Sequence, residues 1–175
     1  VYNESESAII ATLKDCDVEN TTVKATAYDF CTTGMVAFVY AGDNDKIEFE
    51  NCSVSGTFTI ENTEYTGLAH SVASQKYSNN DAKASEMAYG GIVGLSRGIN
   101  IVDCVNNAAI TVKQIAKMEN DIDAVPTIGG ITGNAFYVKV DGVEYNTHLT
   151  GCVNNADILY QDKSCNTETW RVIPA

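Results

Sequence analysis

Six cysteines give this sequence its widest range of possible chemistry, because thiols form disulfides, bind zinc and act as nucleophiles. Six cysteines in 175 residues is well below the roughly 8–10% of a small domain built on disulfides. No two of them have the C-x-x-C spacing that is typical of zinc and redox sites. The cysteines are Cys16, Cys31, Cys52, Cys104, Cys152 and Cys165.

Four of these cysteines occupy one position of an internal repeat, at intervals of 36, 52 and 48 residues. The repeated segments are LKDCDVENTTV, FENCSVSGTFTI, IVDCVNNAAITV and LTGCVNNADILY. Since free cysteine is among the most buried residue types, we predict an inward-facing structural ladder of sulfurs. Its members are Cys16, Cys52, Cys104 and Cys152. Disulfides or a metal are the alternative, because strands stacked about 4.8 Å apart lie within the Cα range of a disulfide.

Other catalytic chemistry finds little support. With only His70 and His148, a zinc site of three histidines is impossible, and no H-E-x-x-H motif occurs. No nucleotide-binding glycine motif is present either, so the pairs Gly90-Gly91 and Gly129-Gly130 predict tight corners or positive φ angles. We therefore predict no catalytic residue, no cofactor and no bound metal.

The elements that carry the cysteines can be predicted from the alternation of apolar and polar residues. Ile47 and Phe49 share one phase, whereas Cys52, Val54 and Phe58 follow in the other. Alternation with period two is typical of a strand with one buried face. A change of phase at each repeated cysteine indicates a corner. Strand, corner and strand in units of about 36–52 residues predict a parallel β-solenoid. A helix is indicated only weakly, at 112–118.

Two asparagine pairs follow the third and fourth cysteines of the ladder. Asn tolerates left-handed backbone and bonds to its own chain at turns, and aligned Asn side chains on successive strands bond to one another. We therefore predict a second structural ladder at a corner. Its members are Asn106, Asn107, Asn154 and Asn155.

The stretches GGIVGLSRGINIVDCVNNAAI and GGITG…LTGCVNNADI resemble the glycine-rich, GLUG-like repeats of bacterial surface and secreted proteins. The match is good over 90–112 and 129–160, fair over 34–60 and faint over 1–27, where the double glycine and the Asn pair are missing. The resemblance implies turns of a right-handed parallel β-helix, as in adhesin-like proteins and around secreted peptidases. It also implies a secreted or cell-surface bacterial protein.

We therefore predict an all-β chain that forms a right-handed parallel β-helix (β-solenoid) of about four turns with loop and hairpin insertions. A single domain spans 1–175. Its units cover approximately 9–27, 33–60, 90–112 and 129–160, and a C-terminal cap covers 161–175. We expect either a mature or a truncated chain, since the sequence opens without Met or a signal peptide.

Insertions between the units are the expected functional surface, because unit-to-unit length variation in repeat proteins falls on loops. A long loop is expected over 61–89, another over 113–128, and a hairpin around Asp141-Gly142. Tyrosines and one histidine in these insertions form the predicted binding surface: Tyr65, His70, Tyr77, Tyr89, Tyr137 and Tyr145. Acidic residues also gather in loops, at Asp43 with Asp45 and at Glu119 with Asp121 and Asp123, where solvated turns are favoured over calcium sites.

The composition limits the classes of partner that the chain is expected to bind. With 11 basic and 23 acidic side chains the net charge is −12, which argues against nucleic acid and anionic lipid. No apolar run of membrane-spanning length occurs. We predict a non-catalytic interaction or adhesin-like module that binds a glycan or a protein, as a monomer or by end-to-end association. The alternatives are a polysaccharide lyase or glycoside hydrolase, which needs positioned carboxylates, and a structural fragment of a longer surface solenoid.

Overall fold

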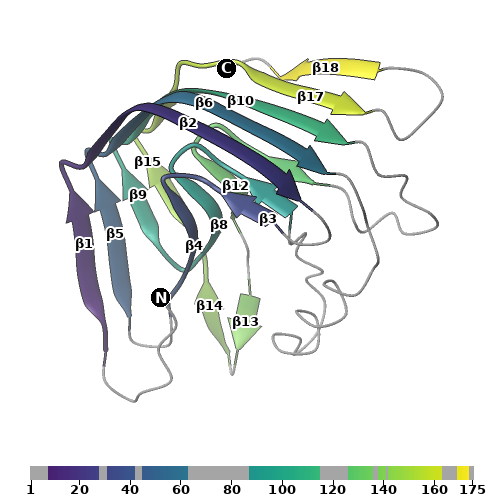
Figure 1. Cartoon of the computed structure of the whole chain (residues 1–175). Helices are drawn as coiled ribbons and strands as arrows, with labels where there is room; N and C mark the ends of the chain where they lie inside the picture. The colour runs from purple at the N-terminus through teal and green to yellow at the C-terminus, as the bar shows by residue number, and fades with distance from the viewer. Residues whose placement is uncertain are drawn as a thin grey trace.

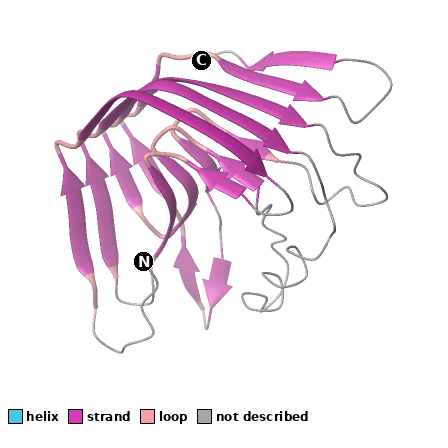
Figure 2. Ribbon diagram, in the orientation of Figure 1, coloured by secondary structure: helices cyan, strands magenta, loops and turns pink. Residues whose placement is uncertain are grey.

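The computed structural model describes residues 8–27, 31–41, 45–62, 87–114, 126–135, 138–140, 142–162 and 169–173. Every regular element in these ranges is a β-strand (Figures 1 and 2). The prediction of an all-β chain is therefore confirmed for the described residues. The weak helical pattern at 112–118 is wrong over 112–114, which lie in a strand, while 115–118 fall outside the described residues. None of the described segments forms a helix that is long and apolar enough to cross a membrane.

Most of the described strands belong to four sheets whose neighbours are parallel. Sheet 1 contains β1 (Ile10–Lys14), β5 (Lys46–Glu50), β9 (Asn100–Val102) and β15 (His148–Thr150). Sheet 2 contains β2 (Asp17–Ala27), β6 (Ser53–Asn62), β10 (Val105–Gln114), β16 (Val153–Asn154), β17 (Ile158–Asp162) and the antiparallel β18 (Thr169–Ile173). Sheet 3 contains β3 (Cys31–Thr33), β7 (Met87–Tyr89) and β11 (Thr127–Ile128). Sheet 4 contains β4 (Val36–Tyr40), β8 (Val93–Arg97) and β12 (Thr132–Ala135).

Within each sheet the strands lie side by side in chain order. The residues that directly follow the repeated cysteines occupy one register of sheet 2, where Asp17 and Val105 both pair with Ser53, and Val105 pairs with Val153. Figure 1 shows β2, β6, β10 and β17 running together across one side of the molecule. The strand pairing therefore superposes the segments that the repeat aligns.

The corner between sheets 1 and 2 is made by the residue immediately before each repeated cysteine. Asp15, Asn51 and Asp103 have φ angles of 54°, 52° and 49°, and Gly151 has 66°. This left-handed region is uncommon for residues other than glycine, and Asn and Asp are the ones that tolerate it best. The predicted corner is thus present. The glycine pairs, which predict tight corners or positive φ angles, do not have positive φ, and neither do the asparagine pairs.

The main core takes inward-facing apolar side chains from all four sheets. Phe49, Phe58, Ile101 and Ile110 are fully buried because strands flank them on both sides. Leu149, on β15, is 45% exposed. Burial is therefore deepest in the middle strands of each sheet and falls toward the outer ones.

The predicted hairpin is confirmed. Strands β13 (Val138–Val140) and β14 (Val143–Tyr145) pair antiparallel, with Val140 opposite Val143. Gly142 in the connection has a φ of 87°, as hairpin turns with two connecting residues require. The hairpin extends away from the four sheets in Figure 1.

Candidate functional site

The four repeated cysteines are free thiols in the structure. Cys52 and Cys104 are buried, whereas Cys16 and Cys152 at the two ends of the row are partly exposed. Among the described residues, no group of three or more His, Cys, Asp and Glu side chains is arranged to hold a metal ion.

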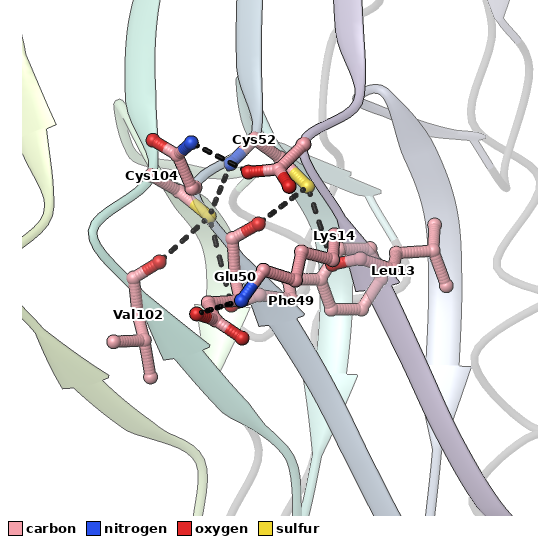
Figure 3. A network of polar contacts seen from close by, with 9 residues as sticks. Leu13, Lys14, Phe49, Glu50, Cys52, Val102 and Cys104 are labelled. Atoms are coloured by element: carbon pink, nitrogen blue, oxygen red, sulfur yellow. Dashed lines mark hydrogen bonds and ion pairs between the residues drawn. The ribbon is translucent and has the colours of Figure 1, made fainter.

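Each inner thiol has polar partners at the corner (Figure 3). The Sγ of Cys104 donates toward the carbonyl oxygens of Phe49 at 3.7 Å and Val102 at 3.3 Å. Two equivalent pairs repeat this pattern: Leu13 and Glu50 around Cys52, and Ile101 and Thr150 around Cys152. The thiols thus satisfy carbonyl groups at the ends of the sheet 1 strands, a role that apolar alternation does not reveal.

Burial makes the inner thiols poor nucleophiles. It raises the pKa of Cys104 to about 11 and also raises the pKa of Cys52, since a low-polarity environment disfavours the thiolate. Reactive cysteines need the opposite shift. Cys52 and Cys104 are therefore buried, free thiols of low reactivity at the corner.

The asparagine pairs form the predicted ladder. The Nδ2 of Asn106 donates to the Oδ1 of Asn154 at 2.7 Å, and the Nδ2 of Asn155 donates to the Oδ1 of Asn107 at 3.0 Å. The row formed by Asn106, which is buried, and Asn154 also explains why the second residue of each glycine pair must be glycine. A Cβ on Gly91 would overlap the Asn106 side chain. Close approach to asparagine, and not positive φ, is what these glycines provide.

A cluster of aromatic rings around one arginine lies on sheet 4, at a small core that is separate from the main core. The guanidinium of Arg97 on β8 lies 5.2 Å from the ring centroid of Tyr40 on β4 and 5.5 Å from that of Tyr145 on β14. Phe38 is 5.7 Å from Tyr40, ring to ring, and is 42% exposed. We call Phe38, Tyr40, Arg97 and Tyr145 the aromatic–arginine cluster.

Two features fix this cluster in place. On β4, Val39 lies in the main core, whereas Tyr40 packs against a small second core and the Phe38 ring lies beside the Tyr40 ring. The end of β14 is held next to sheet 4 because Tyr145 packs in the small second core with Leu95. The cluster therefore combines neighbouring strands from distant parts of the sequence with an insertion.

The predicted binding surface changes accordingly. Tyr89 is fully buried and donates from its hydroxyl to the Oδ1 of Asn62 at 2.7 Å. The expectation of an exposed Tyr89 is wrong because β7 begins at Met87 and Tyr89 takes an inward position on it. Tyr145 is 6% exposed and so contributes through the cluster rather than as a free surface ring. The remaining members of that surface lie outside the described residues: Tyr65, His70, Tyr77 and Tyr137.

The acidic loops contribute one described residue. Asp45 accepts a hydrogen bond from the backbone N–H of Ile9 at 2.7 Å, which joins the segments that lead into β5 and β1. The other acidic positions considered for calcium lie outside the described residues: Asp43, Glu119, Asp121 and Asp123.

Comparison of the chain with protein-family models yields no match. Neither the curated proteins nor the solved structures contain a significant match. The resemblance to GLUG-like repeats therefore stays a prediction, and the function has to be argued from the residues.

Proposed function

We propose that this chain is a non-catalytic interaction module of a secreted or cell-surface bacterial protein, folded as a right-handed parallel β-solenoid of about four turns, and that it binds a glycan. The solenoid is supported by four sheets that receive their strands in chain order. It is further supported by the recurrence of the left-handed residue before each repeated cysteine. Such a scaffold presents regular rows of side chains on rigid strands.

The observation that carries the binding role is the aromatic–arginine cluster. The exposed ring of Phe38 offers an apolar surface against which the C–H face of a sugar ring packs. Arg97, which lies over the Tyr40 ring that Phe38 contacts, adds N–H donors that suit sugar oxygens. An apolar platform combined with a few fixed polar groups is typical of small-ligand recognition.

A glycan array probed with the unmodified chain and two variants tests the proposal. We expect the unmodified chain to be retained on a restricted set of glycans. The Phe38→Ala variant is expected to lose this retention. The matched control is Thr57→Ala, which removes an exposed side chain on sheet 2 and is expected to leave retention unchanged. A silent array, or equal loss with both variants, would contradict the proposed site.

A further inference from the structure

Arg97 has an incomplete set of partners for a guanidinium. Its Nη2 donates to the carbonyl oxygen of Ala41 at 3.2 Å, while its Nε is buried and has no hydrogen-bond partner in the structure. The two tyrosine rings of the cluster lie near it at 5.2 and 5.5 Å. Rings attract the cation but accept none of its hydrogen bonds in the plane of the guanidinium, where five N–H donors point.

No carboxylate among the described residues pairs with Arg97. Two lysines on the sheets do have one: the Nζ of Lys14 lies 2.6 Å from the Oε1 of Glu50, and the Nζ of Lys113 lies 2.7 Å from the Oε1 of Glu61. Unlike a lysine ammonium at the surface, the guanidinium of Arg97 lies against two aromatic rings, where an accepting carboxylate has few alternatives. A partly buried guanidinium is most stable opposite a carboxylate that accepts from two of its nitrogens.

We propose that Arg97 binds the carboxylate of an acidic sugar, which makes the ligand a glycan with an isolated uronic or sialic acid residue. This inference rests on the proposed glycan-binding function and specifies its ligand. The neighbouring ring of Phe38 then packs on the same or the adjoining sugar. The ligand has one carboxylate among neutral sugars, because a polyanion would be repelled by the net charge of −12.

The test compares each acid with its own methyl ester on the unmodified chain. The probes are sialyllactose, a glucuronate-terminated disaccharide and a galacturonate-terminated disaccharide, each as the acid and as the methyl ester, with lactose as a neutral reference. We expect at least one acid to bind about 10- to 100-fold more tightly than its ester, as charged hydrogen bonds allow. NMR titration measures this weak binding without any substitution in the protein.

Variants assign the effect to Arg97. Arg97→Gln is expected to bind acid and ester equally, and Arg97→Lys to keep only part of the preference, since a lysine lacks the planar fork. Lys113→Gln removes one positive charge on sheet 2 and is expected to leave the preference intact. Thermal unfolding of each variant shows whether the fold is preserved.

The outcomes separate the inference from the function on which it rests. If acid and ester bind equally well, the carboxylate inference is wrong while glycan binding stands. If no probe binds and the array is also silent, both are wrong. A preference for the acid that survives Arg97→Gln, or disappears with Lys113→Gln, would overturn the assignment to Arg97.

Discussion

Replacing Asn106 by alanine should destabilise the protein far more than the same substitution at its neighbour Asn107. The Nδ2 of Asn106 donates to the Oδ1 of Asn154 at 2.7 Å and to the carbonyl oxygen of Ala108 at 3.1 Å. Its Oδ1 accepts from the backbone N–H of Ala108 at 3.0 Å. The side chain is fully buried, so water cannot replace these partners without entering the core.

The magnitude follows from these contacts. Three hydrogen bonds at about 1 kcal/mol each, together with buried partner atoms left without a bond, reduce the free energy of unfolding by about 3–5 kcal/mol. Asn107 is exposed and accepts a single bond from Asn155 at 3.0 Å. Its replacement by alanine is expected to cost no more than about 0.5 kcal/mol.

Circular dichroism during thermal unfolding measures the difference. For a chain of this length each kcal/mol shifts Tm by about 2–4 °C, which gives roughly 6–20 °C for Asn106→Ala and about 2 °C or less for Asn107→Ala. Urea unfolding of both variants checks that the slope m is unchanged. Equal losses at the two neighbouring positions would show that the buried ladder does not carry the stability we assign to it.

Four further outcomes are expected. A Cβ on Gly130 would overlap the Asn154 side chain, so Gly130→Ala should cost about 1–3 kcal/mol in the free energy of unfolding, and much less after Asn154→Gly; additive effects in a double-mutant cycle would contradict this. Because the pKa of Cys104 is raised by burial to about 11, its alkylation at pH 8 should be at least about 100-fold slower than in the denatured chain. By linkage, the stability that this thiol contributes is present below about pH 8.5 and is lost as the pH rises toward 11; a mass-spectrometric alkylation series with a rate independent of pH would refute the shift. Gly151 has a φ of 66°, and the Gly151→Asn variant should unfold about 2–8 °C higher than Gly151→Val. Both side chains displace that of Asp103, but only Asn tolerates the left-handed region. Equal Tm values in calorimetry would contradict this explanation from backbone conformation.

Much of the local structure can be predicted from the sequence because it depends on nearby residues. The change of phase at Cys52 predicts a corner, and the structure has one there. The residue with left-handed backbone at the corner is harder to predict, because the repeat has different residue types there: Asp15, Asn51, Asp103 and Gly151. These side chains share a tolerance for left-handed backbone and little else.

The candidate site depends on contacts that local patterns do not contain. Tyr40 pairs with Arg97 across 57 residues, and this register depends on an insertion whose length differs from one repeat to the next. The third member, Tyr145, is the last residue of β14 in the hairpin, and its contact with Arg97 requires this end of the hairpin to lie against sheet 4. The alternating aromatics at Phe38 and Tyr40 were the available signal, but alternation alone does not say which face is exposed.

The long intervals between paired strands have a consequence for how the chain folds. Parallel partners are separated by between 35 residues, from Thr21 to Gly56, and 57 residues, from Val36 to Val93. Each such pairing must first close a large loop, at a cost in chain entropy that no local contact offsets. Folding is therefore expected on the millisecond-to-second scale of proteins with high contact order. The β13–β14 hairpin, with Val140 opposite Val143, can form within about 1–10 μs. It is therefore expected to form before the parallel sheets.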